Sequence, residues 1–104
     1  MVNLGQYFKE EDWNRFFELI VPRELEKNRE FYDYLDSLGV FSVEINKVLA
    51  SLYPYMFFGK RSVFERWINM KHTMLDDNTP IEILQMQNGE QTLKEYLMRY
   101  PLLI

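Results

Sequence analysis

Apolar residues recur at spacings of three and four along most of this chain, which is the repeat of an amphipathic α-helix. Residues 6–20 show the pattern first, and Pro22 is expected to end this helix and to open a second one that runs to Gly39. Ser42 is placed to cap a third helix, which either ends or kinks near Pro54. The first 60 residues therefore predict three helices.

The second half of the chain carries three helix starts of the capping-box type, in which a side-chain acceptor is followed three residues later by Glu or Gln. The pairs are Ser62 with Glu65, Thr79 with Glu82, and Asn88 with Gln91. Pro80 falls at a first helical position, where its missing N–H is not needed, and Gly89 marks the break before the last helix. Residues 61–104 therefore predict a three-helix unit.

No pair of segments alternates apolar and polar residues with the period of a β-strand, so no sheet is expected. The predicted fold is an all-α bundle of five or six helices in one compact domain, with residues 1–60 as its N-terminal part and residues 61–104 as its C-terminal unit. The side chains expected inside are Trp13, Phe16, Phe17, Phe31, Leu35, Val48, Leu49, Leu52, Phe64, Trp67, Ile68, Leu84, Leu93 and Leu97.

A succession of residues in the second half resembles a known family. The residues are Phe64, Arg66-Trp67-Ile68, a connection through Leu75, Thr79-Pro80-Ile81-Glu82-Ile83-Leu84, Gly89, and Leu93 to Leu97. Their order is similar to that in the C-terminal toxin-binding domain of the bacterial Xre/MbcA/ParS-type antitoxins. The resemblance implies a protein that docks on a cognate toxin, neutralises it, and uses its C-terminal end to block the toxin's active site.

The N-terminal half departs from that family, in which many members carry a DNA-binding helix-turn-helix. Here residues 1–60 hold seven basic and ten acidic side chains, residues 61–104 hold five and six, and the net charge of the chain is −4. Duplex binding depends on Lys and Arg that neutralise phosphates. DNA binding by this chain alone is therefore not expected.

Candidate catalytic chemistry is sparse. The chain has no Cys, and His72 is its single histidine, without a nucleophile in a recognisable setting. The run Asp76-Asp77-Asn78 lacks the mid-loop Gly and the spaced ligands of an EF-hand, so it indicates a solvated loop that leads into a helix. We expect no enzyme, no metal and no cofactor.

Two segments favour binding to another protein. The first is the apolar run Tyr55, Met56, Phe57 and Phe58, which is either buried under the helices or part of a surface that a second copy covers in a homodimer. The second is the C-terminal end, where Pro101 ends the last helix and leaves an aliphatic tail. The predicted partner-binding residues are Tyr96, Arg99, Tyr100, Pro101, Leu102, Leu103 and Ile104. The tail either contacts the partner or folds back onto the domain's own core.

Two classes of function remain open. One is an antitoxin that binds a cognate toxin, and the other is a stand-alone helical interaction module, such as a phage-encoded inhibitor of a host protein or a structural dimer subunit. Trp67 lies within an apolar stripe and is expected in the core rather than at an interface. No leader and no membrane span is visible, so we expect a cytoplasmic protein of bacterial type.

Overall fold

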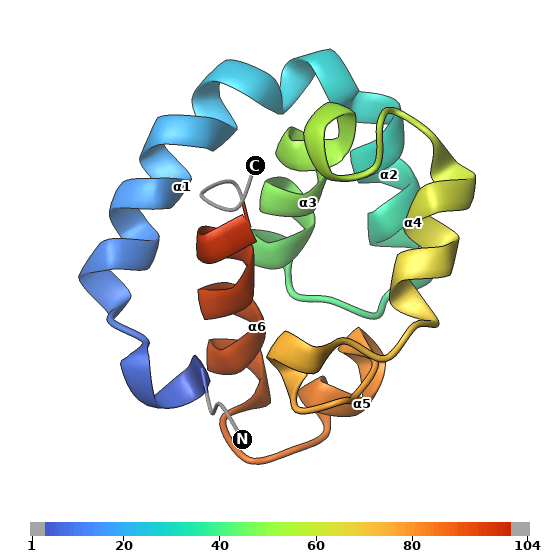
Figure 1. The fold of residues 1–104 in the computed structure, drawn as a ribbon. Coiled ribbons are helices and arrows are strands. Elements are labelled where there is room, and N and C mark those ends of the chain that lie inside the picture. The colour runs from blue at the N-terminus through green and yellow to red at the C-terminus, as the bar shows by residue number, and fades with distance from the viewer. Residues whose placement is uncertain (1–3, 101–104) are drawn as a thin grey trace. The chain divides into compact units, whose positions relative to one another are not determined.

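The computed structural model describes residues 4–100, and within them the chain forms six α-helices, three short 3-10 helices and no strand (Figure 1). The predicted all-α class is confirmed. The α-helices are α1 (Glu10–Glu24), α2 (Arg29–Leu38), α3 (Val43–Met56), α4 (Arg61–Ile68), α5 (Pro80–Leu84) and α6 (Gly89–Arg99). The 3-10 helices are η1 (Leu4–Tyr7), η2 (Glu26–Asn28) and η3 (Thr73–Leu75).

The helices group into two units. One unit, called here the terminal unit, comprises the described residues up to Trp13 and from Arg61 on, and the other, the middle unit, is Asn14–Lys60. The sequence pattern predicted a division between residues 60 and 61 but did not predict that η1 and the start of α1 belong with the C-terminal helices. No local pattern of apolar residues reveals which distant segment a short helix packs against.

The middle unit is organised by the packing of α2 on α3. Phe31 of α2 and Tyr53 of α3 stack with their ring centroids 3.9 Å apart and an angle of 15° between the ring planes. Gly39 ends α2 in the left-handed conformation that favours glycine, as predicted. The hydroxyl oxygen of Ser42 caps α3 by accepting the backbone N–H of Ile45 across 3.3 Å, also as predicted.

The two prolines of this unit lie inside helices. The prediction that Pro22 ends the first helix is wrong, because α1 continues to Glu24. Proline removes the bond to the carbonyl four residues back, here that of Glu18. Pro22 and Glu18 are both exposed, so water can bond that carbonyl in place of the missing N–H. Pro54 likewise lies within α3, which runs past Leu52 to Met56.

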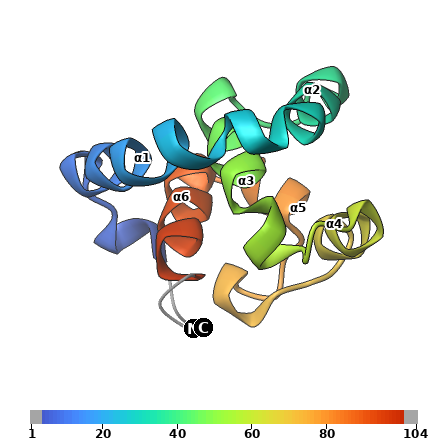
Figure 2. The ribbon, with the colours of Figure 1, turned by 90° about the horizontal axis from the view of Figure 1, so that it is seen from above.

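The terminal unit is built around α6. Both views show η1 lying alongside this helix (Figures 1 and 2). The short helix α5, which precedes α6 in the chain, also packs against α6. Gly89, the first residue of α6, is buried, and a Cβ at this position would overlap the backbone carbonyl of Ile83. Glycine therefore permits the close approach of α5 and α6, whereas the sequence predicted only a break before the last helix.

Only one of the three predicted capping boxes forms. Thr79 accepts the backbone N–H of Glu82 across 3.1 Å, and the Glu82 carboxylate accepts the backbone N–H of Thr79 across 2.8 Å. The box at Ser62 is absent because α4 already begins at Arg61, which places Ser62 inside the helix. Asn88 precedes α6 but has a left-handed backbone and makes no capping bond, since a capping side chain needs an extended backbone.

Most of the predicted core is buried, including Trp13, Phe64, Leu93 and Leu97, each of which has no exposed surface. Three of the residues expected inside are only half-buried: Phe16, Phe17 and Leu84. In α1 and α5 the buried face therefore differs slightly from the predicted one: Val21 of α1 and Ile83 of α5 are buried. Trp67 is 7% exposed and lies in the core, as predicted.

Candidate functional site

The end of α6 carries the predicted partner-binding residues, and the structure gives them different roles. Tyr96 is buried, and its hydroxyl accepts the indole N–H of Trp67 across 3.3 Å. Its ring centroid lies 5.9 Å from that of His72. Burial raises the pKa of the Tyr96 phenol above its usual value. Tyr96 therefore supports the helix from inside and offers little surface to a partner.

Arg99, at the last residue of α6, is partly exposed and held in place. Its Nε donates to Oε2 of Glu95 across 2.8 Å, and its guanidinium carbon lies 5.2 Å from the ring centroid of Tyr7. The side chain of Arg99 is 37% exposed, whereas that of Glu95 is 11% exposed. Tyr100 follows the helix and is half-buried, with its ring 6.1 Å from that of Tyr96.

The predicted contacts at Pro101, Leu102, Leu103 and Ile104 lie outside the described residues. At the end of the described chain, Arg99 and Tyr100 are therefore the predicted binding residues that keep surface available for a partner. Tyr7 joins them from η1 and was not predicted. No signal in the sequence links Tyr7 to Arg99, because the two are far apart in the chain and meet only when η1 packs along α6.

The apolar run after Pro54 is divided by the structure. Met56 and Phe57 are buried, with 3% and 1% of their surface exposed, so these two residues belong to the core and not to a surface. Tyr55 and Phe58 are 55% and 72% exposed. Phe58 also has a φ of 55°, in the left-handed region that bulky side chains rarely adopt. Of the four residues predicted as a dimer surface, only Tyr55 and Phe58 are thus exposed.

Tyr55 is fixed to the end of α1. Its hydroxyl donates to Oε1 of Glu24 across 2.7 Å, and the other carboxylate oxygen of Glu24 accepts a bond from the ammonium of Lys27 across 3.0 Å. These bonds, first that from Tyr55, lower the pKa of Glu24, and the same contact raises the pKa of Tyr55. The exposed ring therefore has a defined position on the middle unit.

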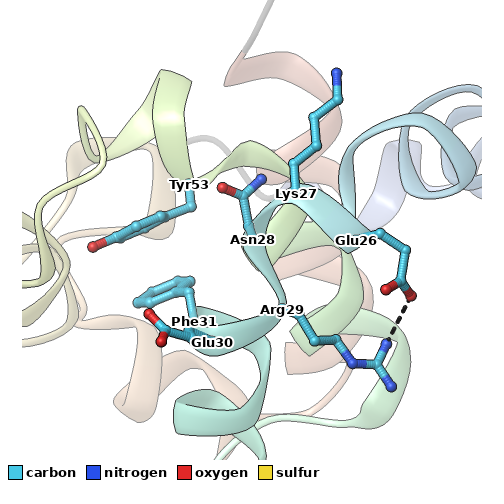
Figure 3. Close-up of a pocket in the computed structure, with 7 residues that line it drawn as sticks. All are labelled: Glu26, Lys27, Asn28, Arg29, Glu30, Phe31 and Tyr53. Atoms are coloured by element: carbon cyan, nitrogen blue, oxygen red, sulfur yellow. Dashed lines mark hydrogen bonds and ion pairs between the residues drawn. The ribbon is translucent and has the colours of Figure 1, made fainter.

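A pocket of about 300 Å³ lies in the middle unit and includes Lys27 in its lining (Figure 3). Its lining is Glu26, Lys27, Asn28, Arg29, Glu30, Phe31 and Tyr53. Phe31 and Tyr53 form its apolar wall, while Arg29 is directed to Glu26, with 3.2 Å between Nη1 and Oε1. Lys27 is bonded to Glu24. The pocket has no cluster of catalytic groups and no charge of one sign that would select a ligand.

The loop residues considered for chemistry have structural roles. Nε2 of His72 lies 2.9 Å from the backbone oxygen of Trp67, and the backbone N–H of His72 donates to the carbonyl of Asn78 across 3.1 Å. Oδ1 of Asp76 is buried and has no hydrogen-bond partner among the described residues. Within residues 4–100 no group of three or more His, Asp or Glu side chains is arranged to hold a metal ion.

No protein-family model, curated protein or solved structure matches this chain. None of the helices between residues 4 and 100 has the length and apolar character needed to span a bilayer.

Proposed function

We propose that this chain is an antitoxin-like protein-binding module that docks on a cognate toxin and neutralises it. The observation that carries the proposal is the end of α6, where Arg99 and Tyr100 keep accessible surface directly before the aliphatic residues 101–104. Arg and Tyr are types enriched in binding hot spots. Leu102, Leu103 and Ile104 would each contribute about 1.5–3 kcal/mol if a partner buried them fully.

The terminal unit suits this role because the rest of α6 is fixed. Tyr96 is bonded to Trp67, Gly89 packs against α5, and Lys94 is buried with its ammonium 5.1 Å from the ring centroid of Trp13. A rigid helix presents the residues at its end without a large loss of conformational entropy on binding.

In this proposal the protein acts in the bacterial cytoplasm, without a cofactor and without enzymatic activity. It binds a protein and does not bind DNA by itself, because its charge is acidic in both halves of the sequence. Its partner is expected to be encoded by a neighbouring gene, as is common for a toxin and its antitoxin.

The test is co-purification of the full chain with the product of the neighbouring gene. We expect the two to co-elute, and we expect deletion of residues 101–104 to weaken binding while the melting temperature of the chain stays nearly unchanged. A matched control is Leu19→Ala, which truncates an apolar side chain that is 60% exposed in the middle unit and should leave binding intact. A deletion that lowers the melting temperature but leaves binding unchanged would contradict the proposal and indicate a tail folded onto the core.

A second candidate is a stand-alone interaction module that forms a homodimer. The observation that favours it is the pair of exposed aromatic side chains near this turn, Phe58 at 72% and Tyr55 at 55%, because aromatic residues are enriched at protein interfaces. Tyr55, held in place by Glu24, extends the same segment. The two candidates use different units of the chain, so variants in each unit can separate them.

A further inference from the structure

We propose that Arg99 is a receptor for a carboxylate of the protein partner, an acidic side chain that the guanidinium binds through its two terminal nitrogens. This inference rests on the proposed protein-binding function of the end of α6 and adds the chemistry that the partner must bring. The geometry that carries it is the way in which Glu95 and Tyr7 hold Arg99.

Glu95 engages only the inner nitrogen of Arg99. The bond of 2.8 Å runs from Nε to Oε2, and no hydrogen bond of Nη1 or Nη2 to another described residue is present. An arginine presents five N–H donors in a planar fork that matches the two oxygens of a carboxylate. With Nε occupied, the outer edge of the guanidinium keeps its parallel donors for a second acceptor.

The ring of Tyr7 supplies a second contact to this fork. The guanidinium carbon of Arg99 lies 5.2 Å from the centroid of the Tyr7 ring, within the range of a cation–π contact. Two contacts, one at Nε and one between the guanidinium carbon and the Tyr7 ring, restrict the movement of the group. A preorganised fork loses less entropy when it binds a carboxylate.

Lys94, on the same helix, is a buried cation with a structural role and can be compared with Arg99. It is 5% exposed, lies 3.5 Å from Oε2 of Glu90, and has the rings of Phe8 and Trp13 at 5.9 and 5.1 Å. Arg99 has the same kind of neighbours, a carboxylate on α6 and an aromatic ring from the N-terminal segment. Its side chain nevertheless remains 37% exposed, so it can be reached from solvent.

Arg29 of the middle unit provides a matched control. Its guanidinium carbon also lies 5.2 Å from a tyrosine ring centroid, that of Tyr32, and it also pairs with a glutamate, Glu26. That pair, however, runs through Nη1 and spans 3.2 Å, so the outer edge of Arg29 is already engaged. Arg29 is more exposed than Arg99, at 53% against 37%. A response that followed exposure alone would therefore be larger at Arg29.

The test is a titration of the ¹⁵N-labelled full chain with a hexaglutamate peptide whose termini are blocked, observed at the Nε–H signals of both arginines. We expect a saturable shift at Arg99 and little change at Arg29. Tyr7→Ala should weaken the apparent affinity roughly two- to fivefold, whereas Tyr7→Phe, which keeps the ring face, should leave it unchanged. Arg99→Lys, which keeps the charge but not the fork, should weaken binding of the peptide roughly tenfold.

Three results would overturn the inference: no shift at Arg99, equal shifts at Arg99 and Arg29, or an equal response to an oligonucleotide of the same charge. The last result would mean that Arg99 responds to negative charge in general and does not select a carboxylate. Failure here is distinct from failure of the proposed function. Loss of co-elution with the neighbouring gene product leaves the peptide titration intact, and a negative titration leaves binding through residues 101–104 to be measured separately.

Discussion

The indole N–H of Trp67 donates to the hydroxyl of Tyr96 across 3.3 Å, and both side chains are buried. Trp67 belongs to α4 and Tyr96 to α6, so the bond joins two helices of the terminal unit. Each residue gives the other a partner for its polar group. The bond gives the buried indole N–H of Trp67 an acceptor, so this large aromatic side chain enters the core with its donor satisfied.

The first prediction concerns the two members of this pair. Trp67→Ala removes a large buried ring and should lower the free energy of unfolding by about 3–5 kcal/mol. Tyr96→Phe keeps the ring but leaves the indole N–H without its acceptor, which should lower the free energy of unfolding by about 1–3 kcal/mol. Urea unfolding followed by circular dichroism measures both. Tyr32→Phe, at a half-buried tyrosine, is the control and should change stability by less than about 0.5 kcal/mol.

The second prediction follows from the raised pKa of Tyr96. Because burial raises the pKa of this phenol above its ordinary value of 10.0, the folded chain holds the proton more tightly than the unfolded chain does. The resulting stability is fully present below pH 10 and is lost as the pH rises through the folded pKa. Unfolding midpoints measured in urea above pH 10 should therefore fall in the parent and fall less steeply in Tyr96→Phe. Parallel curves for the two proteins would contradict this.

The third prediction concerns Gly89. Alanine ordinarily stabilises a helix relative to glycine by about 0.5–1 kcal/mol, but here its Cβ would overlap the carbonyl of Ile83. Since that neighbour is backbone, α5 and α6 must separate, and we expect Gly89→Ala to destabilise the chain by about 1–3 kcal/mol. Gly39→Ala is the comparison variant. Gly39 has a positive φ but no atom within 4 Å of the added Cβ, so its substitution tests the backbone conformation without a steric overlap. A melting temperature of Gly89→Ala at or above that of the parent would refute the close contact.

The sequence predicted best where a local rule decides the outcome. The Thr79 box, the Ser42 cap and the glycine at position 39 all depend on residues within one helical turn. The pattern failed at Pro22, where the helix continues through a proline in an exposed turn. It also failed at Ser62, where the helix begins two residues earlier than the cap would place it.

The candidate site depends on contacts that local patterns do not encode. Arg99 was predicted to bind a partner, but its support from Tyr7 arises only because η1 packs along α6. The spacing of apolar residues likewise could not predict that Phe57 is buried and Phe58 exposed. The two are adjacent and of the same type, and their burial differs only because of the turn at this point. That turn places Phe58 and Gly59 in the left-handed region, at φ values of 55° and 65°.

The fourth prediction tests the capping box at α5. Thr79→Ala removes the acceptor for the N–H of Glu82 and should lower the free energy of unfolding by about 0.5–2 kcal/mol. Ser62→Ala, at a hydroxyl that caps no helix, should change it by less than about 0.5 kcal/mol. Chemical denaturation at neutral pH compares the two. Equal losses in both variants would show that the box adds nothing.

The same box predicts a dependence on acid. The hydrogen bond from the backbone N–H of Thr79 lowers the pKa of Glu82 below its ordinary value of 4.5. The unfolded chain therefore binds the proton more tightly, and the stability from this group is present above pH 4.5 and lost as the pH falls through the folded pKa. Glu82→Gln should remove this part of the acid dependence, which thermal melts between pH 3 and pH 6 would measure. An unchanged pH profile in Glu82→Gln would contradict it.

The last prediction separates folding from association at Phe58. A bulky residue with a φ of 55° stores backbone strain on the order of 1–3 kcal/mol, which asparagine at the same φ largely avoids. If Phe58 contacts a second copy, Phe58→Asn should weaken the dimer and at the same time raise the stability of the single chain. Light scattering at tens of micromolar gives the mass, and a thermal melt at a concentration where the chain is monomeric gives the stability. Leu19→Ala, at an apolar side chain of the middle unit that is 60% exposed and outside the predicted dimer surface, is the control and should retain the dimer. A single-chain mass for the parent would exclude the homodimer, whereas a dimer that Phe58→Asn leaves intact would move its interface away from this turn.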